Sequence, residues 1–248
     1  WITISNCLFK GYYGVQYGAA IHGYNTGNIT ISYSQFINNH ANDYGDNYDT
    51  CGGAIYLCNY SSTSTLVIKN SLFDGNSALG FTDLYSPSGS AGAVYARGYA
   101  SVRFSNCEFI SNSAGSEGAV LVYSSNENAT LTIDADSNAD GTVDGDGCLF
   151  FDNSSDLISG AIYSSVATTI KNSSFVNNTA GQGGAIYATK SLTLTDTIFT
   201  GNEAKCYAVY AGYDDADGNP EYEYYVNGGA IYSTSSVEVQ SCEFVNNQ

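Results

Sequence analysis

Two short motifs alternate along the whole of this 248-residue chain. One is Phe-x-x-Asn, and the other is a small residue followed by Gly-Ala-Ile or Gly-Ala-Val and usually Tyr. Motifs that recur at a short period indicate a fold made of stacked copies of one unit. The first motif begins at Phe36, Phe73, Phe109, Phe150, Phe175, Phe199 and Phe244, with a partial copy at Phe9. The second occupies residues 53–56, 92–95, 118–121, 160–163, 184–187 and 229–232, with a degenerate copy at 18–21.

The spacing of these copies indicates the architecture. Successive Phe residues lie 27, 37, 36, 41, 25, 24 and 45 positions apart, so a unit near 24 residues carries insertions of variable length. Upstream of the Phe, apolar residues alternate with polar ones, and a period of two indicates a β-strand. A strand there, a turn, a second strand at the Gly-Ala-Ile motif and a polar return would complete one coil. Stacking then buries each apolar position on its own copy.

We therefore expect an all-β fold, a right-handed parallel β-helix of about seven coils. Residues 1–248 would form a single domain, with inserted loops near 134–147 and 203–227. The chain opens on a strand pattern and stops after Phe244 without another Gly-Ala-Ile copy, so we expect it to be a segment of a longer chain. Solenoid ends need a cover, and the expected covers are further coils of the same chain or end-to-end self-association.

The charge of the chain limits its partners. The net charge is −17, from 24 acidic and 7 basic residues, and the basic residues are scattered singly. Nucleic acid binding needs clustered Lys and Arg, so we expect no nucleic acid partner. No apolar run approaches the roughly 18 residues that span a bilayer, so we expect no direct membrane insertion.

Small and polar residues form two columns ahead of the Phe. We interpret the position two before it as a buried small side chain and not a zinc ligand; its members are Cys7, Ser34, Ser71, Cys107, Cys148, Ser173, Thr197 and Cys242. One residue earlier, an Asn recurs that could form a side-chain ladder at a bend; its copies are Asn6, Asn70, Asn106 and Asn172. A disulfide is expected more readily among Cys51, Cys58 and Cys206, at strand ends or in loops, than between neighbouring parallel strands.

Together, the alternating Phe-x-x-Asn and Gly-Gly-Ala-Ile copies resemble the repeats of chlamydial polymorphic membrane proteins and related β-helical surface proteins. The resemblance covers almost the whole chain, and seven alternations of two motifs make it specific. It implies a β-helix displayed at a cell surface or outside the cell and used in adhesion. The long insertions depart from the family pattern, so bacterial autotransport is not implied. Similar repeats occur in large eukaryotic surface proteins.

One insertion has the character of a cation site. Asp136, Asn138 and Asp140 stand at alternate positions before a glycine, as in the first half of an EF-hand loop. The closing Glu is missing, and Asp144 or Asp146 would have to replace it. The hypothesis is a calcium ion at Asp136, Asn138, Asp140 and Asp144. The alternative is an acidic solvated turn, because turns select the same residues.

Three sequons lie in the polar return between coils, where exposure is expected. They begin at Asn28, Asn59 and Asn128, and would carry N-linked glycans if the protein is eukaryotic. The sequons at Asn153 and Asn172 fall in motif columns, and we interpret these two residues as structural.

A tyrosine column follows the Gly-Ala-Ile motif. If the preceding Ile or Val points inward, strand alternation directs the next side chain outward, which predicts a surface aromatic stack. Such a stack could be a sugar-binding platform or a mutually packed ladder that shields the strands, and the pattern favours the ladder. Its members are Tyr56, Tyr95, Tyr163, Tyr187 and Tyr232.

Three function classes remain. The repeats favour a noncatalytic extracellular structural or adhesive rod, part of a larger cell-surface or filament-forming protein, whose partners would be glycans or a cell-surface receptor. The alternative is a polysaccharide lyase or glycosidase, or a carbohydrate-binding module; neither His22 nor His40 has a nucleophile motif near it. Ice binding through Thr-x-Thr rows is disfavoured, because those rows do not align over consecutive coils.

Overall fold

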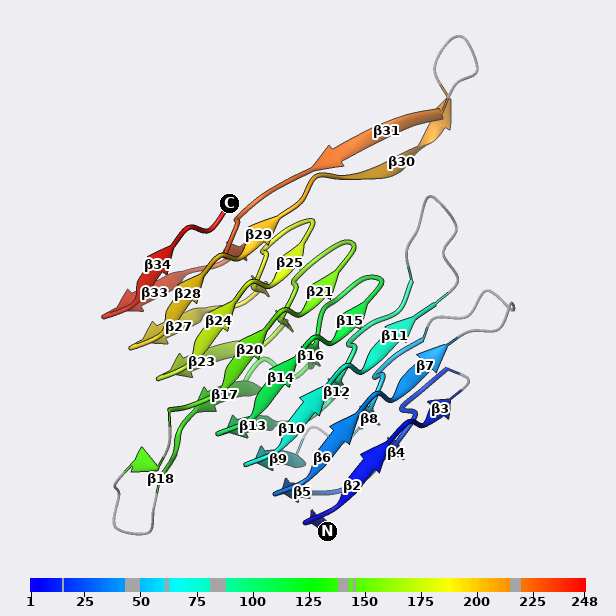
Figure 1. Ribbon diagram of the computed structural model, residues 1–248, viewed down its shortest axis with the longest axis vertical. Helices are drawn as coiled ribbons and strands as arrows, with labels where there is room; N and C mark the ends of the chain where they lie inside the picture. Colours follow the sequence, from blue (N-terminus) through cyan, green and yellow to red (C-terminus); the bar gives the residue numbers. More distant parts are fainter. Residues whose placement is uncertain are drawn as a thin grey trace.

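The structure is a computed structural model of the chain, and it describes residues 1–14, 16–42, 50–60, 63–80, 88–137, 143–144, 146–214 and 220–248. Four parallel sheets, named A to D here, run along a single stack of coils (Figure 1). Each of seven coils gives one strand to each sheet, and β33 and β34 add one further strand each to sheets A and B. Every strand pairs with its equivalents in the neighbouring coils. The expected all-β parallel β-helix of about seven coils is confirmed.

Sheets A and B contain eight strands each. Sheet A consists of β1 (Ile2–Ser5), β5 (Ile29–Ser32), β9 (Thr65–Lys69), β13 (Ser101–Ser105), β17 (Thr130–Asp134), β23 (Ala167–Lys171), β27 (Leu192–Thr195) and β33 (Val237–Gln240). Sheet B consists of β2 (Leu8–Lys10), β6 (Gln35–Ile37), β10 (Leu72–Asp74), β14 (Glu108–Ile110), β20 (Leu149–Phe151), β24 (Ser174–Val176), β28 (Ile198–Thr200) and β34 (Glu243–Val245).

Sheets C and D contain seven strands each. Sheet C consists of β3 (Tyr13–Gly14), β7 (His40–Asn42), β11 (Ser77–Leu79), β15 (Ser113–Ala114), β21 (Ser154–Ser155), β25 (Thr179–Ala180) and β29 (Glu203–Ala204). Sheet D consists of β4 (Ile21–Tyr24), β8 (Ile55–Cys58), β12 (Val94–Arg97), β16 (Val120–Tyr123), β22 (Ile162–Ser164), β26 (Ile186–Ala188) and β32 (Ile231–Ser233). Two antiparallel hairpins leave the stack, β18 (Asp136–Ser137) with β19 (Val143–Asp144) and β30 (Tyr207–Asp214) with β31 (Pro220–Tyr225).

A complete coil contains four strands, more than the sequence predicts. The expectation of two strands per coil is wrong, because the Phe-x-x-Asn motif forms a strand of its own in sheet B and the residues after it form a short strand in sheet C. The motif strand is three residues long in each coil, which is too short for an alternating pattern to stand out.

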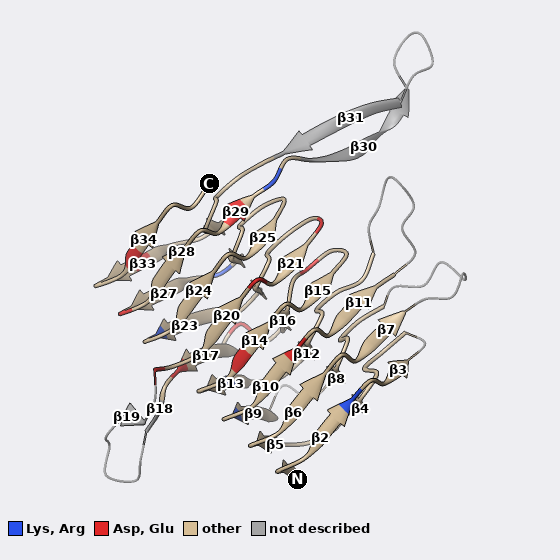
Figure 2. Ribbon diagram, viewed as in Figure 1, with Lys and Arg blue, Asp and Glu red and all other residues tan. Residues whose placement is uncertain are grey.

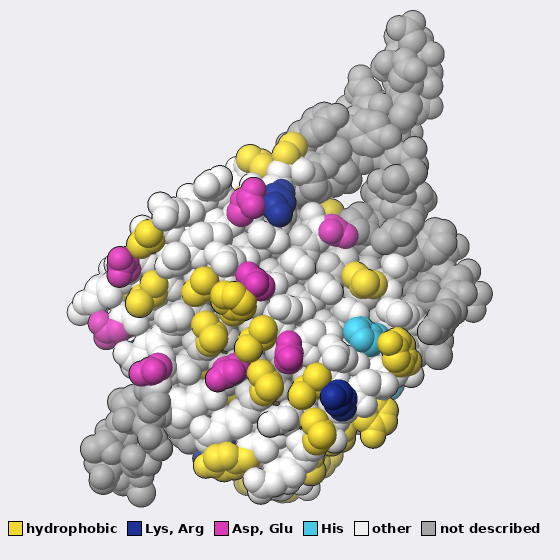
Figure 3. Space-filling view, viewed as in Figure 1, with side chains coloured by type: hydrophobic (Ala, Val, Ile, Leu, Met, Phe, Trp, Pro, Cys, Tyr) yellow, Lys and Arg dark blue, Asp and Glu magenta, His cyan; other side chains and the backbone are white. Residues whose placement is uncertain are grey.

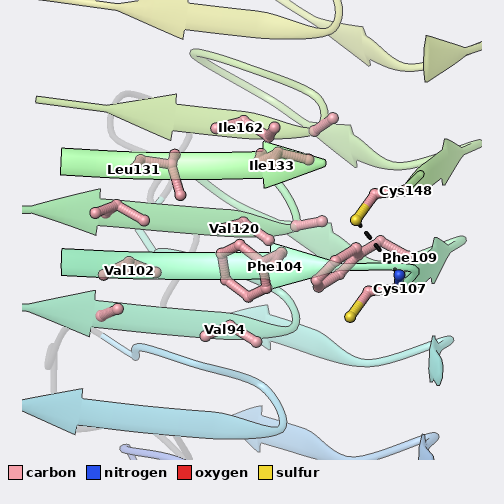
Figure 4. Packing of buried hydrophobic residues seen from close by; sticks show 14 of the residues in the cluster. Val94, Val102, Phe104, Cys107, Phe109, Val120, Leu131, Ile133, Cys148 and Ile162 are labelled. Carbon is pink, nitrogen blue, oxygen red and sulfur yellow. Dashed lines mark hydrogen bonds between the residues drawn. The ribbon is translucent and has the colours of Figure 1, made fainter. Parts of the chain in front are cut away.

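The core is a set of columns in which each residue packs on its own copy. Every Phe of the motif pairs in register with the Phe of the next coil. Their rings stack at centroid distances of 4.7 to 4.9 Å and interplanar angles of 0 to 7°. This distance equals the spacing between hydrogen-bonded strands, so backbone pairing and ring stacking have the same period. Val102 and Phe104 of β13 and Leu131 and Ile133 of β17 face them from sheet A (Figure 4).

The Asn of the Phe-x-x-Asn motif forms a continuous amide ladder. In Asn112, the side-chain nitrogen donates to Oδ1 of Asn153 in the next coil and to the carbonyl oxygen of Phe73 in the previous coil, both at 3.0 Å. Its own Oδ1 accepts from the backbone N and Nδ2 of Asn76. The same bonds recur from coil to coil, so these buried amides are satisfied by each other and by the backbone. The ladder consists of Asn39, Asn76, Asn112, Asn153, Asn178, Asn202 and Asn247.

The Asn column one position before Cys, Ser or Thr has another role. Asn70, Asn106 and Asn172 each have φ of 49°, in the left-handed region that Asn tolerates better than most residues. They make the corner between sheets A and B. The side-chain bond expected in this column is present between Asn106 and Asn70, where Asn106 donates at 3.2 Å. The uninterrupted ladder belongs to the Phe-x-x-Asn motif.

The glycine that opens the Gly-Ala-Ile motif permits a close approach between coils. A Cβ added to Gly92 would lie 2.5 Å from the carbonyl oxygen of Ser113 and 2.6 Å from its backbone nitrogen. Carbon atoms do not approach backbone groups so closely, so any larger residue would push the coils apart. Gly53, Gly118, Gly160, Gly184 and Gly229 are enclosed by backbone in the same way.

The column of Cys, Ser and Thr side chains also links the coils. The backbone N of Cys107 donates to Sγ of Cys148 at 3.3 Å (Figure 4), and the backbone N of Cys148 donates to Oγ of Ser173 at 3.2 Å. Burial raises the pKa of the Cys148 thiol well above its ordinary value. All seven cysteines lie in the described part of the chain and none of them forms a disulfide, which includes Cys51, Cys58 and Cys206.

The outer surface of the stack is polar with single charges. Figure 2 shows Lys, Arg, Asp and Glu distributed over many coils, and Figure 3 shows apolar side chains interspersed with acidic ones on the face that carries sheets B and C. None of the described segments is a helix with the length and apolarity that a bilayer crossing requires.

Candidate functional site on the outer face of sheet D

The tyrosine column lies on the outer face of sheet D. Ile55 and Leu57 of β8 are buried inside the coil, and alternation directs Tyr56 between them to the outside. The same alternation holds in the neighbouring strands, where Tyr95 pairs in register with Tyr56 and with Leu121. The members of the column are partly buried, because each ring covers part of its neighbour.

The stack of rings has two parts. Tyr56 and Tyr95 stack with centroids 4.9 Å apart, and Tyr163 and Tyr187 stack at 5.6 Å. Tyr232 continues the second part, tilted by 39° against Tyr187 at 4.9 Å. Leu121 occupies the position between Tyr95 and Tyr163 and is 5% exposed. The column is therefore an aromatic stack with one aliphatic step.

Burial changes the ionisation of these phenols. It raises the pKa of Tyr95 to about 12, and the thiol of Cys51 adds to that shift while the cation of Arg97 opposes it. Burial also raises the pKa of Tyr56, Tyr163 and Tyr187 above the ordinary value. These four phenols are therefore neutral at physiological pH and can offer a hydroxyl and an apolar face, but not a charge.

A second outward column runs beside the tyrosines, two residues later in each strand. Tyr24, Cys58, Arg97 and Tyr123 pair in register along it. The guanidinium carbon of Arg97 lies 5.3 Å from the ring centroid of Tyr123, a cation–π distance. Tyr123 is 40% exposed, so strand β16 ends in an accessible aromatic ring. No repeat in the sequence indicates this column, because its residue type changes from Tyr to Cys to Arg and back to Tyr along the coils.

Only two of the four proposed calcium ligands are among the residues that the structure describes. Asn138 and Asp140 fall outside the described residues, whereas Asp136 and Asp144 are paired across the hairpin β18 and β19. Elsewhere in the described part, no three His, Cys, Asp or Glu side chains lie together as metal ligands would.

The three sequons differ in exposure. Asn128 is exposed, and Asn28 is half-buried with its Oδ1 accepting from the backbone N of Thr65 at 2.9 Å. The expected exposure of Asn59 is wrong. This residue is 4% exposed and its Nδ2 donates to the carbonyl oxygen of Thr26 at 2.9 Å, because the turns between sheets D and A stack on one another here. Asn153 is a fully buried member of the amide ladder, as its motif position indicates.

Comparison with known proteins supports the interpretation of the motifs. The model of the Chlamydia polymorphic membrane protein repeat matches residues 172–189 and 196–234. These stretches contain the Phe175 and Phe199 copies of the first motif and the last two copies of the second. No curated protein and no solved structure matches the chain significantly. The predicted resemblance is confirmed within residues 172–234, where the chain matches the chlamydial polymorphic membrane protein repeat.

Proposed function

We propose that this chain, with its chlamydial polymorphic membrane protein repeats, is part of a noncatalytic β-helical rod at a cell surface, with a structural or adhesive role. The observation that supports this role most directly is the amide ladder. It runs from Asn39 to Asn247 although the coils it joins differ greatly in length. The most frequently repeated buried polar side chain therefore holds neighbouring coils together.

The outer surface fits contact with other surfaces better than chemistry on small molecules. Two repeated columns of polar side chains lie inside the coils, the Asn amides and the Cys, Ser and Thr column, and both are hydrogen-bonded within the stack. Outside, the coils present partly exposed aromatic rings and single charges. Tyr and Arg are residues that contribute strongly to binding interfaces.

Bead adhesion tests the adhesive role. Beads coated with the chain should be retained on cultured cells more than beads coated with a globular protein of equal negative charge, and soluble chain should compete for retention. Retention equal to that of the control beads would exclude an adhesive role.

Polysaccharide incubation tests the noncatalytic assignment. The chain should release no reducing ends and no unsaturated products from polygalacturonate or from a β-glucan, in calcium or in chelator. Turnover of either polymer would establish the enzyme alternative, and the acidic residues of 134–147 would then be the first to replace.

End-to-end stacking is the self-association that we propose for the rod. In the last coil, Val237, Val239 and Phe244 are 42, 49 and 46% exposed, whereas the equivalent positions one coil earlier are buried. Further coils or a second copy would cover these strand edges in register. Val239→Lys should reduce concentration-dependent assembly measured by sedimentation. Assembly that is unchanged by this substitution would place the contact elsewhere.

A further inference from the structure

A groove of about 510 Å³ lies along the turns that join sheet D to sheet A. One wall is the loop that follows β16, and the floor is made by the shorter turns that follow β22, β26 and β32. Residues 124–129 separate β16 from β17, whereas residues 165–166 alone separate β22 from β23. The groove therefore exists because one coil has a longer turn than the three coils after it.

The wall is held by its own hydrogen bonds. The backbone N of Asn126 donates to Oγ of Ser124 at 3.2 Å, and Oδ1 of Asn126 accepts from the backbone N of Asn128 at 3.0 Å. The backbone N of Ser124 in turn donates to Oγ of Ser165 on the floor at 3.3 Å. The loop is thus anchored to the next coil, and the groove has a defined shape.

The lining of the groove is rich in hydroxyl groups. Ser125, Ser165, Thr189, Ser191 and Ser235 contribute hydroxyls from four successive coils. The exposed side chains of Glu127 and Lys190 add one charge of each sign. Such a lining offers many donors and acceptors with little net charge, which suits a ligand that carries many neutral polar groups.

Tyr123 closes the groove at one end with an apolar surface. Strand β16 lies between β12 and β22 in sheet D, and Arg97 of β12 lies over the Tyr123 ring. Arg97 lines a smaller hollow of about 120 Å³ on its own side together with Tyr60, while Tyr123 lines both hollows. Since the cation occupies the β12 side, the other face of the ring is directed to the groove.

We propose that this groove binds a linear oligosaccharide laid along the axis of the coils. One sugar ring packs its C–H face on Tyr123, and the following rings exchange hydrogen bonds with the serine and threonine hydroxyls and with Lys190. The coils repeat about every 4.8 Å, so successive turns offer similar groups at a spacing close to the length of a sugar unit. The proposal gives the adhesive role a ligand class and rests on that role for its biological use.

Calorimetric titration tests the proposal with three probes: cellohexaose, chitohexaose and hexagalacturonate. At least one probe should bind with a Kd in the micromolar to millimolar range, and Tyr123→Ala should weaken that binding at least about tenfold. Tyr13→Ala is the matched control, because Tyr13 is 68% exposed on sheet C, away from the groove, and its loss should leave the affinity unchanged. Lys190→Ala should weaken hexagalacturonate selectively if the bound glycan is acidic.

A second variant protects the test against a folding defect in the first. Ser235 is exposed, so Ser235→Trp should fill the groove without disturbing the core and should abolish binding. Circular dichroism would establish that both variants are folded. No binding of any probe at millimolar concentration, or binding that neither variant changes, would overturn the proposal. Bead adhesion that survives Ser235→Trp would overturn the groove as the adhesive surface but leave the adhesive role.

Discussion

The side-chain oxygen of Asn112 accepts two hydrogen bonds from Asn76, one from the backbone N at 3.0 Å and one from Nδ2 at 2.9 Å. Asn112 thus accepts from the previous coil the same two bonds that it donates to the next. One residue type satisfies its own buried amide group in each coil from Asn39 to Asn202. A carboxylate has the acceptor oxygens but lacks the donors, so it cannot pass the pattern on.

Replacing Asn112 with Asp should destabilise the stack in a pH-dependent way. Burial would raise the pKa of the new carboxyl in the folded state above its unfolded value near 3.9. The stability of the variant should therefore be closest to that of the wild type below that unfolded pKa, and should fall as pH rises through the folded pKa. Denaturant unfolding at several pH values checks this. A constant difference between variant and wild type across this range would contradict it.

Gly92→Ala should destabilise the protein by about 1 to 3 kcal/mol, because the added methyl group meets the backbone of Ser113. Gly27→Ala is the control, since nothing lies within 4 Å of a Cβ at Gly27. That change should be neutral or stabilising by up to about 1 kcal/mol, through loss of freedom in the unfolded chain. Equal unfolding midpoints for the two variants would refute the close-approach explanation.

Alkaline pH should weaken the fold through Tyr95. Its folded pKa of about 12 lies above the ordinary value of 10.0, so its contribution is complete below pH 10.0 and is lost as pH rises from there towards 12. Tyr95→Phe removes this ionisation. The stability difference between wild type and Tyr95→Phe should be flat below pH 10.0 and should then shift in favour of the variant. Parallel stability curves up to pH 12 would show that Tyr95 titrates normally.

The cysteines should differ in their rate of reaction with a thiol reagent. Cys206 is exposed and should react quickly in the native protein, whereas Cys148 is buried and its thiol pKa is raised, so it should react only on unfolding. Cys206→Ser should remove the fast phase and leave the slow one unchanged. A fast phase that persists in this variant would assign the accessible thiol to another cysteine.

Calcium binding remains a proposal for Asp136, Asn138, Asp140 and Asp144. If these residues hold an ion, chelation should increase proteolytic cleavage within 134–147 while the circular dichroism of the rod is unchanged, because the coils stack independently of that insertion. Asp144→Asn should reproduce the effect without chelator. Cleavage that is identical with and without chelator counts against the site.

The repeats were sufficient to predict the coils, whereas the groove could not be predicted. Phe and Gly-Ala-Ile recur because each copy packs on itself, so their environment is the same in every coil. The sixth strand of sheet A gave no alternating signal because Thr168 takes an inward position there, with its hydroxyl bonded to Ser164 and to the carbonyl oxygen of Val166. The groove depends on a difference between one turn and the next, which a repeat pattern does not record.

The amide ladder makes the reach of this molecule independent of the number of residues in it. Asn153 and Asn178 are 25 residues apart and Asn202 and Asn247 are 45 apart, yet each pair is joined by the same hydrogen bond, of 3.0 and 2.9 Å. Each coil therefore advances the axis by one strand spacing, whatever it carries at its side. The length of the molecule along its axis is therefore set by the number of coils. Mutation can change the length, charge or shape of an insertion without changing the spacing between coils. The surface of the molecule can therefore diversify while its length along the axis stays constant.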